Sequence, residues 1–62
     1  MTSYYDVVEV PGGYRGRVYS YDESGDREVV HWTSDQVFSS PAEAMDAAVE
    51  WADENELEVE LG

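Results

Sequence analysis

The hydrophobic positions of this chain repeat with two different periods, one typical of strands and one typical of a helix. Runs rich in Tyr, Val and Trp end at two turn-forming stretches, residues 11–13 and 22–26. Near the end of the chain, Leu57, Val59 and Leu61 alternate with glutamates, which predicts a half-buried strand with these three side chains inward. We therefore expect strands over residues 4–10, 14–21, 27–33 and 56–61.

A helix is predicted between the third and fourth strands, over residues 39–55. Ser40 is a suitable N-cap, Pro41 fits the first helical position, and Glu43 completes an S-x-x-E capping box. Asn55 is expected to end the helix in the left-handed conformation. Apolar residues spaced three and four apart form one stripe, and acidic residues form the opposite row. The stripe is Ala44, Met45, Ala48, Trp51 and Ala52; the acidic row is Glu43, Asp46, Glu50, Asp53 and Glu54.

The order of these elements predicts a single small α+β domain over residues 1–62. The first three strands form an antiparallel meander, the helix packs on one face, and a C-terminal fourth strand completes the order β-β-β-α-β. A right-handed crossover places the fourth strand beside the first, at a sheet edge, although pairing with a partner chain remains an alternative. Gly16 is expected to leave room for the helix or for an aromatic ring.

Alternation along the second and third strands assigns side chains to faces. In the third strand, Val30 and Trp32 are expected on one face, with Val29 and His31 on the other. The second strand divides into Tyr14, Gly16, Val18 and Ser20 on one face and Arg15, Arg17, Tyr19 and Tyr21 on the other.

The composition is strongly acidic. Fifteen Asp and Glu residues stand against three Arg and no Lys, for a formal net charge of −12. At low salt such a chain repels itself, whereas at ~1 M salt the Debye length falls to ~3 Å and screens most of the repulsion. The pattern resembles the salt-adapted proteins of salt-accumulating archaea. The alternative is a nucleic-acid mimic that offers carboxylates to a basic partner protein.

The small size of the chain favours a partner subunit. A domain of 62 residues buries only ~60% of the surface of its unfolded chain. The absence of cysteine excludes disulfides and thiolate zinc sites, and one histidine argues against a dedicated metal site. We therefore expect a homodimer without a cofactor. The first residues have no signal-peptide pattern and no apolar run approaches the ~20 residues of a membrane span, so we expect a cytoplasmic protein.

The chain carries a series of short motifs, which are Gly13-Tyr14-Arg15-Gly16-Arg17-Val18, Gly25, Val29-Val30, Phe38-Ser39-Ser40, Ala44 and Ala48. Together they resemble the small YegP-like family, whose repeat runs aromatic-Arg-x-Arg-apolar, a glycine turn, a strand, and aromatic-Ser-Ser opening a helix. The likeness covers about residues 12–52. It implies a compact sheet-plus-helix unit, paired in tandem or as a dimer, with no biochemical role to carry over. Residues 38–61 are also similar to a second uncharacterised group, in which an Ala-rich helix precedes a short strand.

This chain departs from the YegP-like pattern at two points. Gly16 replaces the usual second aromatic residue, and the helix face that is basic in that pattern is acidic here. The second departure argues against nucleic-acid binding.

The second strand carries the strongest candidate for recognition. Alternating Arg and Tyr can stack on bases and contact phosphates, or they can form the hot spots of a protein interface. The alternative is structural: Arg15 and Arg17 pair with cross-strand acids such as Asp6, Glu9 or Glu28. A net charge of −12 makes nucleic acid an unfavourable partner. The predicted interface residues are Tyr14, Arg15, Arg17, Tyr19, Tyr21 and Trp32.

Two other groups of residues are weaker candidates for chemistry. His31 has Ser34 and Asp35 close in sequence, which is no evidence for a catalytic triad. The acidic stretch 22–26 lacks the spacing of an EF-hand, so we expect no metal site there. We predict a homodimeric protein-interaction or accessory module and no enzyme. The alternatives are a nucleic-acid-associated module that uses the Tyr/Arg face and an acidic decoy that binds a basic protein through Glu43, Asp46, Glu50 and Asp53.

Overall fold

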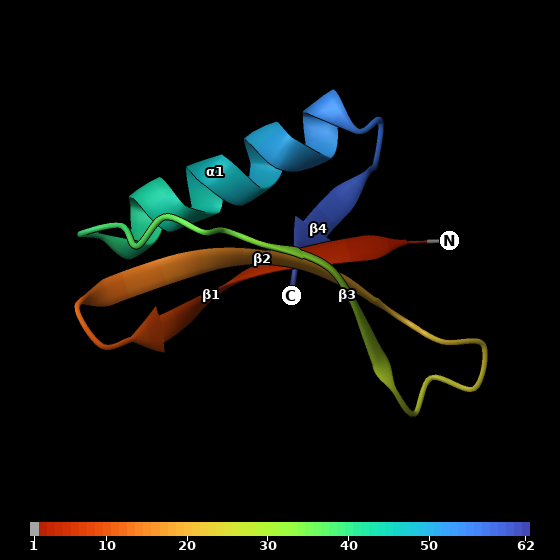
Figure 1. Ribbon diagram of the computed structural model, residues 1–62. Coiled ribbons are helices and arrows are strands. Elements are labelled where there is room, and N and C mark those ends of the chain that lie inside the picture. The colour runs from red at the N-terminus through yellow and green to blue at the C-terminus, as the bar shows by residue number, and fades with distance from the viewer. Residues whose placement is uncertain (1) are drawn as a thin grey trace.

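The computed structural model describes residues 2–62 and shows a four-stranded sheet with one helix on it (Figure 1). The order across the sheet is β3-β2-β1-β4, with β4 parallel to β1 and the other pairs antiparallel. The predicted fold class, β-β-β-α-β, is confirmed, as is the edge position of the last strand beside the first. The elements are β1 (Ser3–Val10), β2 (Gly13–Tyr21), β3 (Glu28–Thr33), α1 (Pro41–Glu54) and β4 (Val59–Leu61).

A tight turn fixes the register of the first hairpin. Val10 pairs with Gly13, so Pro11 and Gly12 alone form the loop, and Gly12 has a φ of 94° that favours glycine. The same register places Tyr4 opposite Tyr19. Strand faces therefore follow directly from the position of this turn.

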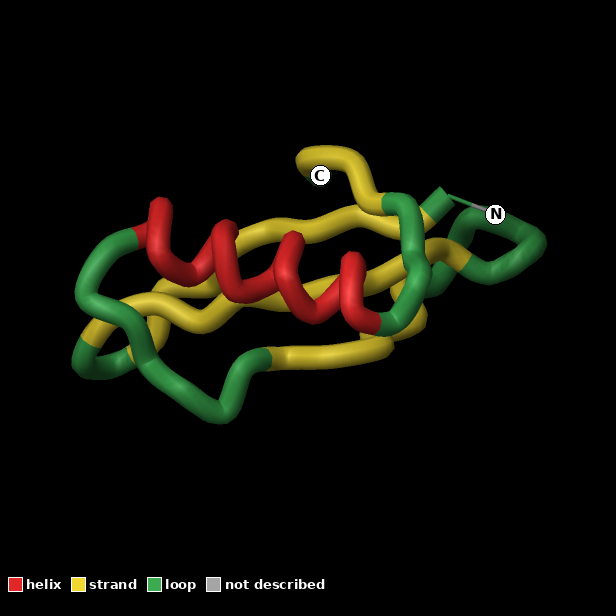
Figure 2. The backbone as a smooth tube through the Cα atoms, turned by 90° about the horizontal axis from the view of Figure 1, so that it is seen from above, coloured by secondary structure: helices red, strands yellow, loops and turns green. Residues whose placement is uncertain are grey.

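The core lies between α1 and the central strands β1 and β2. Small residues allow the close contact: Ala44, Ala48 and Ala52 are buried on the helix, and Val18 is fully buried on β2. A Cβ atom at Gly16 would collide with the backbone oxygen of Ala44, so the glycine makes room for the helix, one of the two predicted possibilities. Seen from above, α1 lies along the sheet over these strands (Figure 2).

The start of α1 follows the predicted cap. The Ser40 hydroxyl accepts a hydrogen bond from the backbone N–H of Glu43 at 3.3 Å. The Glu43 carboxylate accepts from the Ser39 hydroxyl at 2.9 Å, which takes the place of the reciprocal capping-box bond.

The end of α1 differs from the prediction. Asn55 has a φ of −101°, and the left-handed conformation falls one residue later, at Glu56, with a φ of 57°. Asn55 instead donates from its side-chain amide to the backbone oxygen of Trp51 at 2.8 Å. The turn closes where the N–H of Leu57 donates to the oxygen of Ala52 at 2.8 Å.

The predicted faces of β3 are wrong because this strand contains a bulge. Val18 pairs with Trp32, but the next residue of β2, Tyr19, pairs with Val30, which leaves His31 as the extra residue. Trp32 therefore lies on the helix side, where its ring stacks on Trp51 at 5.5 Å and 11°. Val30 lies on the opposite side.

The predicted inward position of the last leucines is also wrong. Only three residues of the tail form a strand, and Leu61 is 65% exposed while Leu57 is exposed before it. The reason is position: β4 is an edge strand, and α1 covers β1 and β2. Val59 alone of the three is half-buried.

Candidate functional site

The side of the sheet away from α1 carries no other element of the described chain, residues 2–62 (Figure 1). We call this surface the open face. The strand registers assign its side chains from all four strands. They are Tyr4, Asp6, Val8 and Val10 of β1; Arg15, Arg17, Tyr19 and Tyr21 of β2; Glu28, Val30 and Thr33 of β3; and Glu60 of β4.

Three tyrosines form a cluster on the open face. The ring centroids of Tyr4, Tyr19 and Tyr21 lie 5.7 to 5.8 Å apart, and two of the pairs meet edge to face. Tyr19 is only 5% exposed, whereas Tyr21 is 40% exposed. Burial, and secondarily the adjacent Tyr21 phenol, raises the pKa of Tyr19 above its ordinary value. The tyrosine cluster thus has one buried ring, Tyr19, and one ring that solvent reaches, Tyr21.

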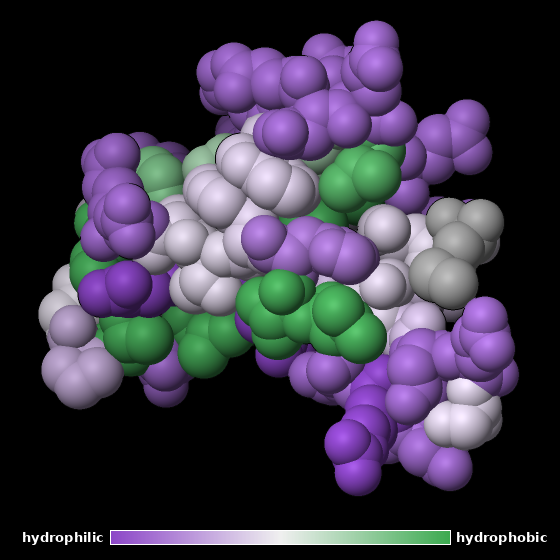
Figure 3. Space-filling view, turned by 45° about the vertical axis from the view of Figure 1, so that its right-hand side comes forward, coloured by the Kyte–Doolittle hydropathy of each residue, from purple (hydrophilic) through white to green (hydrophobic). Residues whose placement is uncertain are grey.

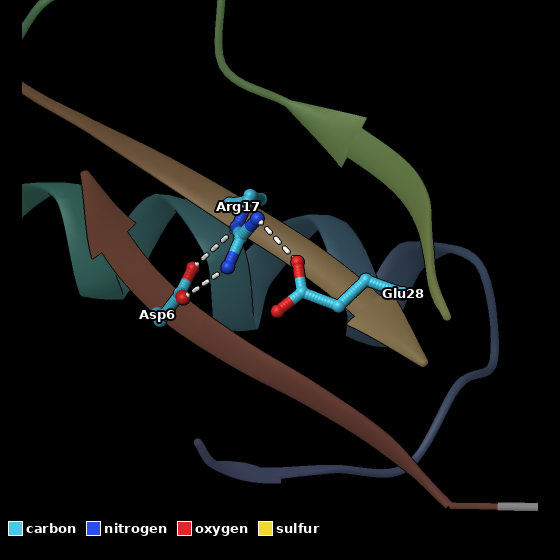
Figure 4. A network of polar contacts seen from close by, with 3 residues as sticks. All are labelled: Asp6, Arg17 and Glu28. Atoms are coloured by element: carbon cyan, nitrogen blue, oxygen red, sulfur yellow. Dashed lines mark hydrogen bonds and ion pairs between the residues drawn. The ribbon is translucent and has the colours of Figure 1, made fainter. Parts of the chain in front are cut away.

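Arg17 joins this cluster to an ion-pair network (Figure 4). Its guanidinium donates two hydrogen bonds to the carboxylate of Asp6, at 2.8 and 2.6 Å, and a third to Glu28 at 3.0 Å. The same group lies 4.5 Å from the centre of the Tyr19 ring. The hydrogen bond with Asp6, followed by the charges of both acids, raises the pKa of Arg17. The predicted cross-strand pairing of Arg17 is therefore confirmed.

The open face is much less acidic than the rest of the molecule. It holds two of the three arginines and three of the fifteen acidic residues, so its formal charges nearly cancel. Figure 3 shows hydrophilic surface over α1, at the top of the view, and again at the lower right. The structure therefore separates one nearly neutral aromatic surface from an otherwise anionic molecule.

The structure divides the six predicted interface residues between two sides of the sheet. Arg15, Arg17, Tyr19 and Tyr21 share the open face, as the alternation predicted. Arg15 donates from its guanidinium to the backbone oxygen of Ser34 at 3.1 Å and not to an acid. Tyr14 lies on the helix side with Trp32, and its backbone pairs with Phe38.

Tyr4 and Val30 are among the open-face residues that were not predicted as interface residues. Tyr4 completes the tyrosine cluster, and Val30 is 49% exposed beside it. The signal for Tyr4 was present, because a two-residue turn at Pro11-Gly12 brings this residue opposite Tyr19. Val30 depends on the bulge, which has no comparable signature.

His31 and Ser34 have different hydrogen-bond partners in the structure. Nε2 of His31 lies 2.8 Å from the hydroxyl of the buried Ser20, whereas the hydroxyl of Ser34 accepts from the N–H of Gly16 and donates to the oxygen of Gln36. Within residues 2–62, no group of three or more His, Cys, Asp or Glu side chains could hold a metal ion. Among the hydrogen bonds of residues 2–62, none joins His31 to Ser34, its neighbour in sequence.

Comparison with known proteins adds no functional assignment. No family model, curated protein or solved structure matches this chain. The resemblance to the YegP-like family therefore stays a prediction. In the part of the chain that the structure describes, no helix has the length and apolar character needed to cross a membrane.

Proposed function

We propose that the protein is a homodimeric protein-interaction module of a salt-rich cytoplasm, without catalytic activity, whose two copies meet through their open faces. The observation that supports this proposal is the nearly neutral aromatic surface on an otherwise anionic molecule. Aromatic and Arg side chains are enriched at the centres of protein interfaces. Two copies that approached through their helices would bring together the acidic residues of α1.

The area required by a stable dimer favours face-to-face contact over edge pairing. A specific interface buries roughly 800 Å² per partner, about a fifth of the 4271 Å² surface of this chain. The two longer dimensions of the molecule are 34 and 23 Å, whose product is about 780 Å². A broad face comes nearest to this area, since a six-residue edge strand such as β3 presents a far narrower surface.

The engagement of both arginines argues against the nucleic-acid alternative. Arg17 is held by two acids, and Arg15 donates to the backbone oxygen of Ser34. A phosphate that approached Arg17 would have to displace Asp6 and Glu28 and enter a field of net negative charge.

The test compares two neighbouring valines of β3. Val30 is 49% exposed on the open face and Val29 is 44% exposed on the helix side, so they form a matched pair. In molar KCl, sedimentation should give the wild type and Val29→Asp twice the mass of the 7.0 kDa chain. Val30→Asp should sediment as a folded monomer, because it buries a carboxylate in the interface. A monomeric wild type, or dimers of both variants, contradicts the proposal.

A further inference from the structure

A groove runs along one side of α1, opposite to the open face of the sheet. Its wider part, about 700 Å³, has Val37, Phe38 and Ala47 as apolar lining and carboxylates from three turns of the helix. A smaller part of about 300 Å³ shares Phe38, Ala47 and Glu50 with the first and extends to the two tryptophans. We call the two parts together the helix groove.

The aromatic end of the helix groove is preorganised. Trp32 comes from β3 and Trp51 from α1, and their rings stack at 5.5 Å with only 11° between the planes. Both rings line the smaller part of the groove. The face of an indole ring is electron-rich, so it favours a guanidinium or another cation over an anion.

The rim of the helix groove is acidic on both sides. Asp35 lies on the loop wall, and Glu43, Asp46, Glu50 and Glu54 lie on the helix wall. No basic side chain lines the groove among the described residues, and both ion pairs of residues 2–62 are made by Arg17 on the other side of the sheet. The ligand that complements this surface carries positive charges together with apolar side chains or the methylene groups of long basic side chains.

The spacing of the carboxylates favours an extended chain over a compact ion. Asp46, Glu50 and Glu54 follow at intervals of four residues, so each step rises roughly 6 Å along the helix. Alternate side chains of an extended peptide are roughly 6.6 Å apart. Arginines at every second position of such a peptide can each meet one carboxylate, since their long stems absorb the small mismatch.

We infer that the helix groove binds an extended, arginine-bearing segment of a basic partner protein. Alternate arginines contact Asp46, Glu50 and Glu54, the segment's apolar side chains rest on Val37 and Phe38, and one guanidinium stacks at the tryptophan pair. This site is independent of the proposed dimer, because it lies on the helix side of the sheet and shares none of its residues with the open face.

The experiment titrates the protein with the acetylated and amidated peptide Arg-Ala-Arg-Ala-Arg. The lowest KCl concentration that preserves the far-ultraviolet circular dichroism of the fold is used throughout. Trp32 and Trp51 are the only tryptophans of the chain, so their fluorescence reports occupancy of the groove directly. Calorimetry then gives the affinity independently of any change in quantum yield.

Two double variants with the same change of net charge decide the outcome. Glu50→Gln with Glu54→Gln should weaken peptide binding roughly fivefold, as expected for the loss of two exposed ion pairs. Glu23→Gln with Glu58→Gln, both exposed and outside the groove, should change it less than twofold. Equal weakening by the two pairs would indicate general attraction to an anionic protein and overturn the inference. So would the absence of binding or of a fluorescence change.

Discussion

Gly16 sets the distance between α1 and the sheet. The glycine faces the buried alanines of the helix, and a methyl group there would meet the backbone oxygen of Ala44 and, at 3.3 Å, the Cβ atom of Ala48. A backbone oxygen cannot rotate away as a side chain can. The close approach of helix and sheet therefore depends on the absence of a single side chain.

We expect Gly16→Ala to destabilise the fold by about 1–3 kcal/mol, because the helix has to move away from β2. Thermal unfolding followed by circular dichroism in molar KCl measures the loss. Adding Ala44→Gly should not restore stability, since the collision is with the backbone. Wild-type stability of the single variant would contradict so close an approach.

The buried Tyr19 phenol predicts a loss of stability at alkaline pH. Its pKa is raised in the folded state above the ordinary value of 10.0, chiefly by burial. Below about pH 10 the Tyr19 phenol is protonated in the folded and unfolded states, and its contribution to stability is fully present. As the pH rises through the folded-state pKa, the phenol ionises first in the unfolded state, so the free energy of unfolding falls. Tyr19→Phe should flatten this alkaline decline more than Tyr5→Phe, a matched variant on the helix side. Unfolding curves of the wild type and both variants across this pH range test the prediction. Equal flattening by Tyr19→Phe and Tyr5→Phe would contradict it.

At the scale of elements, α1 depends on its first turn because its packing surface is made of small side chains. The buried positions are three alanines, which contribute less apolar area than leucines would. The N-cap at Ser40 satisfies a backbone donor that would otherwise rely on water. The neighbouring Ser39 contacts only the exposed Glu43 carboxylate.

We expect Ser40→Ala to cost about 1 kcal/mol of stability, as the loss of an N-cap does. Ser39→Ala is the control and should cost less than about 0.5 kcal/mol, since it removes only an exposed side-chain contact. The free energies of unfolding of the two variants in the same buffer give the comparison. Equal losses would show that Ser39 and not the cap bond secures the helix start.

The elements also show which features a sequence can predict. Hydrophobic period and turn residues predicted all five elements, because they are local signals of backbone geometry. The place of β4 beside β1 followed from the right-handed crossover rule. The same local signals placed Arg17, Tyr19 and Tyr21 on one face. The bulge at His31 was not predictable, because it depends on how β3 fits β2, and it moved Trp32 from the expected interface to the helix groove.

At the scale of the whole molecule, charge is distributed unevenly around a small fold. The net charge of −12 opposes compaction of a chain that has only a few fully buried side chains. Arg17 relieves part of this repulsion locally by joining β1, β2 and β3 through Asp6 and Glu28. The repulsion between the carboxylates around α1 is screened by cations of the solvent.

We expect the unfolding temperature to rise steadily as KCl increases toward ~1 M, where the Debye length is ~3 Å. Each ~1 kcal/mol of relieved repulsion should raise the midpoint by about 4–8 °C in a domain of this size. A tetramethylammonium chloride series is the control, since it screens charge without the small cation. Full stability in dilute buffer would argue against salt adaptation.

The parallel pairing of β4 with β1 also decides how the fold bears a mechanical load. Both strands run in the same direction, with Ser3 beside Val59 and Tyr5 beside Leu61. A pull applied between the beginning of β1 and the end of β4 acts along the strands, so their hydrogen bonds are loaded together in shear. The hairpin between β1 and β2 is antiparallel, and a pull on its open end would break its bonds one after another. We therefore expect a lower force to separate β1 from β2 at the open end of the hairpin than to separate β1 from β4.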